Sequence, residues 1–139
     1  MPTITRTFLK SGLIFFVAAL IAGVLSMARS IFNLPSFVAG LTPVYFHLFM
    51  VGWVTQIIIG IAIWMFPKYT REQPRGHEWL AWATFVLLNG GLLLRVVAEP
   101  AQISSSATIW RWSLVISSVL QWMAGMAFVV NTWPRIRER

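Results

Sequence analysis

The chain has 139 residues, of which 58% are hydrophobic and 11% are charged, and its mean hydropathy is +0.73. Soluble domains carry about 25% charged residues, so this composition excludes most water-soluble folds, and its high hydrophobicity excludes disorder. The absence of cysteine excludes disulfides, thiolate metal sites and covalent c-type haem attachment. A net charge of +7 suits nucleic acid or an anionic membrane surface, and the apolar content favours the membrane.

Four apolar segments are long enough to cross a membrane, since a hydrocarbon core about 30 Å thick requires roughly 20 apolar residues. They are residues 8–31, 44–66, 79–97 and 109–133. Turn and breaker residues separate or end them, namely Asn33, Pro35, Gly40 and Pro43, then Pro67, Pro74 and Gly76, then Pro100 with residues 104–106, and finally Pro134. We predict an all-α integral membrane protein that forms one domain over residues 1–139.

The first segment has a basic start, as a signal peptide does, but its apolar stretch is about twice the usual length. We therefore interpret it as a retained span.

The distribution of Lys and Arg predicts the orientation. Basic residues lie before the first span, between the second and third, and after the fourth, at Arg6, Lys10, Lys68, Arg71, Arg75, Arg135, Arg137 and Arg139. The connections 32–43 and 98–108 contain no Lys or Arg. Both termini are therefore predicted on the cytoplasmic side of the cell's inner membrane. Tryptophans lie near the span ends, as interfacial belts require.

Ionisable residues within spans are costly and by default indicate function. His47 is expected about one turn into the outer leaflet, with Arg95 at a similar depth. Arg29 and Arg111 also lie near outer ends, and Glu99 follows the third span. The simpler interpretations are a histidine bonded to a backbone carbonyl, arginines that reach toward headgroups, and an Arg95–Glu99 pair at i,i+4.

His77 begins the third span at the opposite face, so the two histidines of one chain cannot hold one ligand. Its simpler interpretation is an exposed interfacial residue.

Small and polar residues recur at helical spacing inside the spans. They are Gly52, Gln56 and Gly60, then Asn89, Gly90 and Gly91, then Ser113, Ser117 and Gln121. Such stripes allow the close approach of another helix or a flat ligand, and interhelical packing alone accounts for them. The sequence contains no phosphate-binding loop, paired carboxylates within a span or nucleophile elbow, so a self-contained enzyme is not expected.

The segment that begins at His47 and ends at Pro67, HLFMVGWVTQIIIGIAIWMFP, resembles the second transmembrane helix of the haem-copper oxidase catalytic subunit (subunit I) superfamily. The resemblance rests on His47, on Gly52 with Trp53, on Gly60, and on residues 64–67. In that family the corresponding histidine is an axial ligand of the low-spin haem. The resemblance therefore implies that His47 ligates haem b. The family's copper ligands and its second haem ligand have no counterpart here.

The family's twelve helices form three four-helix arcs, and a four-span chain resembles one arc. A homotrimer would then resemble the whole subunit, with His47 contributed by each copy, as closed cyclic oligomers can complete a site. Arg95, Arg111 and Arg29 would pair with the haem propionates. A threefold His47 site could instead bind copper or zinc.

The resemblance implies electron transfer or the binding or sensing of a diatomic gas. The alternative is a structural or assembly subunit of a respiratory membrane complex, which binds no cofactor. A transporter or channel is a weaker interpretation, because no span carries a charge at mid-membrane, although Asn89 and Gln121 could line a narrow polar path.

Overall fold

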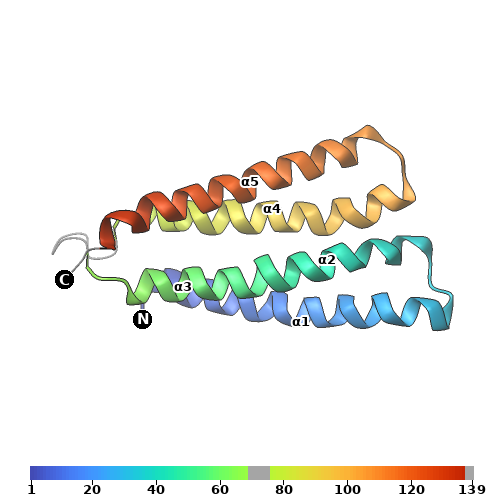
Figure 1. Cartoon of the computed structure of the whole chain (residues 1–139), viewed down its shortest axis with the longest axis horizontal. Helices are drawn as coiled ribbons and strands as arrows, with labels where there is room; N and C mark the ends of the chain where they lie inside the picture. Colours follow the sequence, from blue (N-terminus) through green and yellow to red (C-terminus); the bar gives the residue numbers. More distant parts are fainter. Residues whose placement is uncertain (69–75, 137–139) are drawn as a thin grey trace.

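The computed structural model describes residues 1–68 and 76–136, and every regular element in that part of the chain is a helix. The elements are α1 (Thr3–Phe32), the 3₁₀-helix η1 (Ser36–Gly40), α2 (Leu41–His47), the π-helix η2 (Leu48–Thr55), α3 (Gln56–Met65), α4 (Glu78–Ser104), α5 (Thr108–Thr132) and the 3₁₀-helix η3 (Trp133–Arg135). α2, η2 and α3 follow one another without a break and form one long span (Figure 1). The all-α prediction is confirmed.

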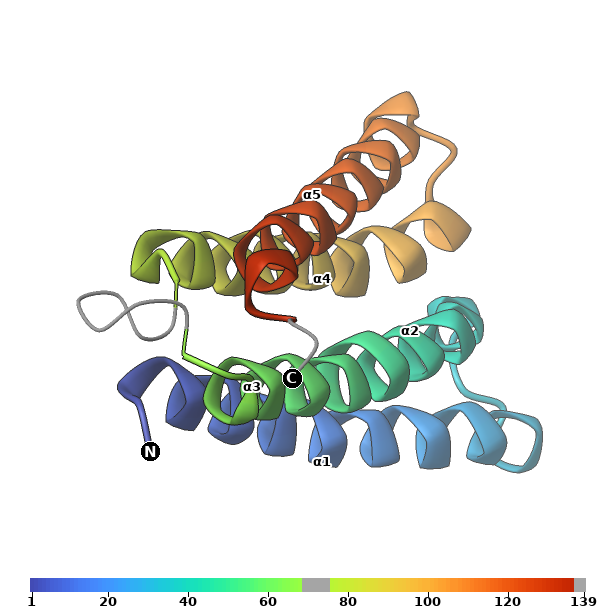
Figure 2. The same ribbon diagram turned by 60° about the vertical axis from the view of Figure 1, so that its left-hand side comes forward.

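The spans are arranged as two antiparallel hairpins (Figure 1). In the first hairpin α1 packs along α2, η2 and α3, and in the second α4 packs along α5. The hairpins meet where α4 lies against η1 and α2. α5 crosses α4 obliquely on the side away from α1 (Figure 2). α4 therefore lies between α5 and the first hairpin.

Two clusters of buried apolar side chains lie between the helices. One consists of Ile4, Phe8, Ile59, Ile63, Ala81, Leu88 and Ala124. The other consists of Ala19, Val44, Leu48 and Leu92. The first cluster includes residues of α1, α3, α4 and α5, so it joins both hairpins, and the second joins the first hairpin to α4.

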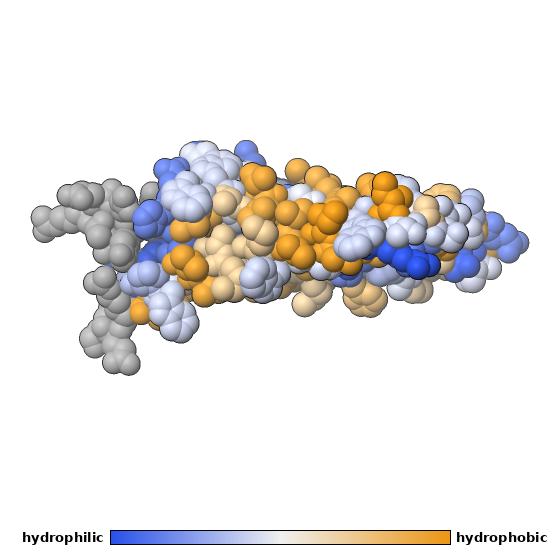
Figure 3. Space-filling model, turned by 90° about the horizontal axis from the view of Figure 1, so that it is seen from above, coloured by the Kyte–Doolittle hydropathy of each residue, from blue (hydrophilic) through white to orange (hydrophobic). Residues whose placement is uncertain are grey.

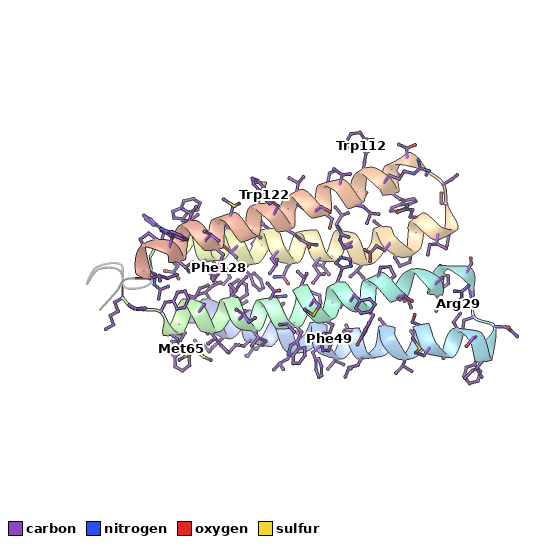
Figure 4. All side chains as sticks on the ribbon, viewed as in Figure 1. Arg29, Phe49, Met65, Trp112, Trp122 and Phe128 are labelled. Atoms are coloured by element: carbon purple, nitrogen blue, oxygen red, sulfur yellow. The ribbon has the colours of Figure 1, made fainter. Side chains whose placement is uncertain are left out.

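The long helices carry apolar surface that no other described part of the chain covers. Four helical stretches among the described residues are long and apolar enough to span a membrane, with hydropathies from 1.7 to 2.3. Hydrophobic residues dominate the middle of the face in Figure 3, and hydrophilic residues gather toward both ends. Trp112 and Trp122 point outward from α5 (Figure 4). Exposed apolar surface of this extent requires lipid or protein to cover it, and we conclude that the chain is a multi-pass membrane protein.

The structure brings the basic segments together at one end of the molecule. α1 begins there, α3 ends there, α4 begins there and α5 ends there (Figure 1), so Arg6, Lys10, Lys68 and Arg135 share that end. Five residues named in the sequence analysis lie outside the described part of the chain, namely Arg71, Pro74, Arg75, Arg137 and Arg139. The connections without Lys or Arg lie at the opposite end. The cytoplasmic assignment of the basic end stays a prediction.

The glycine stripe of the second span packs against α1. A Cβ atom on Gly52 would lie 2.8 Å from Phe15 Cβ, and one on Gly60 would lie 2.9 Å from Phe8 Cβ. Gln56, between them in the stripe, is fully buried and faces α4 instead. α1, rather than a flat ligand, fills the space beside these two glycines.

The prediction that Pro100 interrupts the chain after the third span was wrong, because α4 continues through it to Ser104. A proline inside a helix removes one backbone hydrogen bond. Here η1 packs directly on the proline, and a Cβ atom on Gly40 would lie 2.5 Å from Pro100 Cα. Tertiary packing at this end of α4 therefore offsets the local cost.

Arg135 caps the end of α3 from the other hairpin. Its side chain is 1% exposed, and it donates to the carbonyl oxygens of Pro67 (3.0 Å), Ile63 (3.0 Å) and Phe66 (2.8 Å). The last carbonyls of a helix lack intrahelical partners and attract a cation. Arg135, a topology charge in the sequence, therefore also joins the two hairpins.

Gly40→Ala is expected to lower the midpoint of thermal unfolding in detergent, because the added methyl group would collide with the Pro100 backbone. Overpacking of this kind costs about 1–3 kcal/mol. Gly125→Ala is the matched control, since, apart from the adjoining backbone of α5, no described part of the chain lies within 4 Å of the added Cβ. Alanine also favours a helix over glycine by about 1 kcal/mol. Equal midpoints for the two variants would contradict the contact between η1 and α4.

Candidate functional site

His47 is the last residue of α2, and its ring is oriented by the turn that precedes it. The Nδ1 atom lies 2.8 Å from the carbonyl oxygen of Pro43. A carbonyl oxygen only accepts hydrogen bonds, so the neutral ring carries its proton on Nδ1 and its lone pair on Nε2. The sequence analysis had considered this bond to a backbone carbonyl as the simpler role for His47, and the structure contains it.

The π-helix η2 begins directly after His47 and runs for eight residues, Leu48–Thr55. Within it, the Thr55 hydroxyl donates to the Met50 carbonyl oxygen at 2.8 Å. π-helical turns are rare and frequently occur at functional sites. The wider turns therefore change the register of the second span just where its one histidine lies.

Arg95 of α4 contacts side chains of α2 and α5. Its Nη1 atom lies 3.3 Å from His47 Nε2 and donates to Glu99 Oε1 at 3.2 Å. Its Nε and Nη2 atoms donate to the hydroxyl oxygens of Ser117 (3.3 Å) and Ser118 (2.6 Å). The predicted similar depth of His47 and Arg95 agrees with their contact, and the predicted Arg95–Glu99 pair is present.

Glu99 follows Arg95 by one turn of α4 and contacts both Arg95 and His47. Its side chain is 8% exposed, against 31% for His47. Its Oε1 atom lies 3.2 Å from His47 Nδ1 as well as 3.2 Å from Arg95 Nη1. Its Oε2 atom is buried without a hydrogen-bond partner among the described residues. We call His47, Arg95, Glu99, Ser117 and Ser118 the outer polar cluster.

The charges of the outer polar cluster balance within it. The guanidinium and the carboxylate offset each other, and Nε2 of the imidazole faces the guanidinium as a hydrogen-bond acceptor. Buried charges are tolerated when they are paired and hydrogen-bonded. The cluster therefore connects α2, α4 and α5 while it leaves the Nε2 lone pair of His47 as its one basic nitrogen.

Arg29 and Arg111, the other predicted propionate ligands, lie apart from this cluster. Both side chains are exposed, and Arg29 lies near the end of α1 next to η1 (Figure 4). No hydrogen bond or ion pair in the described part of the chain joins either arginine to His47 or Arg95. Within one chain, the structure thus brings together only two of the four predicted cofactor-binding residues.

His77 lies at the other end of the molecule, where it precedes α4. Its backbone N–H donates to Asn131 Oδ1 at 2.9 Å, and its side chain is exposed. This placement agrees with the predicted separation of the two histidines.

A second polar cluster lies deeper, where Asn89 of α4 meets the first hairpin. Asn89 Oδ1 accepts from Gln56 Nε2 at 3.0 Å and from Ser11 Oγ at 3.1 Å. Asn89 Nδ2 donates to the Phe85 carbonyl oxygen at 2.8 Å. These bonds hold three helices together, as polar side chains do inside membranes. Asn89 is therefore engaged in interhelical packing. Gln121 donates to Ser117, one turn earlier on its own helix α5, at 3.3 Å.

Ser117 and Ser118 are the members of the outer polar cluster that the sequence did not identify as partners of Arg95. Ser117 is fully buried and donates to the Gly91 carbonyl oxygen at 2.6 Å. α5 can approach this closely because Gly91 has no side chain. A Cβ atom at this position would lie only 2.9 Å from the Ser117 carbonyl oxygen. The i,i+4 spacing revealed Glu99 as a partner of Arg95, but its approach to His47 depends on how α2 and α4 pack.

A single chain offers few ligands for a metal ion. Among the described residues, no group of three or more histidine, aspartate and glutamate side chains could hold a metal ion.

The chain matches no protein-family model, no curated protein and no solved structure.

Arg95→Met is expected to lower the thermal unfolding midpoint strongly, because it leaves the buried Glu99 carboxylate without its cation. Removal of one partner of a buried pair costs about 3–5 kcal/mol. Arg111→Met, at an exposed position of α5, should change stability by less than about 0.5 kcal/mol. The double variant Arg95→Met with Glu99→Met should recover part of the loss. If Arg95→Met and Arg111→Met unfold alike, the ion pair is not buried as described.

Proposed function

We propose that this chain binds haem b through Nε2 of His47, as a homo-oligomer in a cell membrane. The observation that carries the proposal is the bond between His47 Nδ1 and the Pro43 carbonyl oxygen (2.8 Å). Histidines that ligate metals usually donate their other ring N–H to a carbonyl or carboxylate, which fixes the tautomer and the ring orientation. Both kinds of group lie beside Nδ1 here, since Glu99 Oε1 is 3.2 Å away.

The residues around His47 fit an anionic porphyrin. Nε2 is contacted by Arg95 Nη1 at 3.3 Å, and a bond from Nε2 to a haem iron would replace this one contact. Arg95 retains donor bonds to Glu99, Ser117 and Ser118. A guanidinium beside the haem pairs well with a propionate. Arg95 is therefore the propionate ligand that the cluster favours, while Arg29 and Arg111 would take part only from another copy.

The sequence resemblance and the arrangement of helices agree with this proposal. The segment from His47 to Pro67 resembles the haem-ligating second helix of the haem-copper oxidase catalytic subunit. α4 separates α5 from the first hairpin, as in an open arc with room for neighbours. The His47 side chain is 31% exposed, which leaves part of the ring accessible to a second copy. Three such arcs would resemble one family subunit, and we propose a homotrimer.

A bound haem supplies one-electron exchange or an open iron position for a diatomic gas. His47 would hold the iron, Pro43 would orient the ring, and Arg95, which is already paired with Glu99, would donate a hydrogen bond to a propionate. The excess of Lys and Arg at the basic end favours both termini in the cytoplasm and a location in the inner membrane. A redox partner or respiratory complex at that membrane completes the proposal.

A second function is favoured by a different observation, namely that both ring nitrogens of His47 have partners inside the chain. In that case the outer polar cluster only joins α2, α4 and α5, and the protein is a structural or assembly subunit without a cofactor. His47→Ala would then leave assembly with a larger complex intact.

The haem proposal predicts a b-type reduced-minus-oxidised absorption spectrum from detergent-purified full-length protein supplied with haem. His47→Ala should abolish the spectrum, because it removes the side chain that would bind the iron. His77→Ala is the matched control and should retain it, since His77 is exposed at the opposite end. Pyridine haemochrome and metal analysis on the same samples separate haem from copper or zinc. Folded wild-type protein that stays colourless would refute haem binding.

The homotrimer predicts a threefold mass by native mass spectrometry. Its population should rise when haem is added, because a ligand that binds only the assembly stabilises it. A stable monomer or dimer in the haem-loaded protein would exclude the trimer and leave a site made by fewer copies.

A further inference from the structure

Glu99 contacts His47 as closely as it contacts Arg95. One carboxylate oxygen, Oε1, is 3.2 Å from His47 Nδ1 and 3.2 Å from Arg95 Nη1. The proton on Nδ1 points to the Pro43 carbonyl oxygen, so the carboxylate acts on the ring through its charge. Electrostatic effects at this distance are strong where water is excluded. Glu99 is thus placed to influence the electron density of the imidazole.

Glu99 is also a poor choice for stability alone. Its side chain is 8% exposed, and Oε2 has no hydrogen-bond partner among the described residues. A buried polar atom without a partner costs free energy and calls for an explanation. Apolar residues of similar volume often match or exceed a buried ion pair in stability. The unpartnered oxygen of Glu99 is therefore not explained by its bond to Arg95.

We propose that Glu99 is a positioning residue that sets the ligand strength of His47 and lowers the reduction potential of the haem held there; this rests on the proposed haem function. A carboxylate beside the distal ring nitrogen raises the basicity of a ligating histidine. Its charge also favours the more positive, oxidised iron over the reduced one. Both effects stabilise oxidised iron and therefore lower the reduction potential.

The position of Glu99 makes the effect specific. The Glu99 carboxylate is within 3.2 Å of the nitrogen opposite the ligating one, whereas Glu78, the other acidic residue of α4, is exposed in the first turn of the helix at the other end. Removing the charge of Glu99 also leaves the charge of Arg95 unbalanced, which further favours reduced iron. Removing the charge of Glu78 leaves the surroundings of His47 unchanged.

The test is a spectroelectrochemical titration of the haem-loaded full-length protein and its Glu99→Gln and Glu78→Gln variants. Glu99→Gln is expected to bind a full complement of haem and to shift the midpoint potential to a more positive value. Glu78→Gln should bind haem with the wild-type potential. A purely structural role for Glu99 would reduce haem content or stability without this selective shift.

Glu99→Asp keeps the charge but withdraws it from Nδ1 by one methylene group. It should shift the potential in the same direction as Glu99→Gln by a smaller amount, and it serves as the test if Glu99→Gln does not fold. Wild-type potentials in the Glu99 variants, with haem bound, would overturn the role of Glu99 and leave haem binding in place. A wild-type protein without haem would overturn both proposals.

Discussion

The bonds of one guanidinium, that of Arg95, determine how three helices of this protein meet. Arg95 lies on α4, and its side chain reaches His47 on α2, Glu99 on its own helix, and Ser117 and Ser118 on α5. A cation in hydrocarbon must be paired or must reach the interface. Because these partners come from three helices, satisfying Arg95 also fixes how those helices meet. The imidazole is thereby held with one nitrogen bonded to the backbone and the other facing a cation.

The two polar clusters along α4 differ in their chemistry. The deeper cluster of Ser11, Gln56 and Asn89 contains only neutral groups that bond to one another and to the backbone, and interhelical adhesion accounts for it. The outer polar cluster contains two charges, a half-satisfied carboxylate and a partly exposed imidazole. This difference is why the proposed chemistry is placed at His47 and not at the cluster around Asn89.

The sequence predicted the features that depend on local pattern. Apolar length identified the spans, and the i,i+4 spacing identified the Arg95–Glu99 pair. Contacts between helices could not be predicted in this way, because the rotation of α4 against α2 and α5 follows from side-chain packing over the whole surface. The approach of Glu99 to His47, the serines around Arg95 and the burial of Arg135 are of this kind. Pro100 illustrates the same limit, since local preference predicted a break where packing by η1 maintains a helix.

The capping of α3 by Arg135 also bears on how the protein is assembled during synthesis. The carbonyl oxygens of Ile63, Phe66 and Pro67 belong to the first hairpin, yet the group that satisfies them follows α5 in the chain. A ribosome releases the second span long before it makes Arg135. Until Arg135 is made, these oxygens need another partner, and the first hairpin acquires its final bonds only when the second hairpin packs against it. The last residues of the second half therefore complete the helix end of the first.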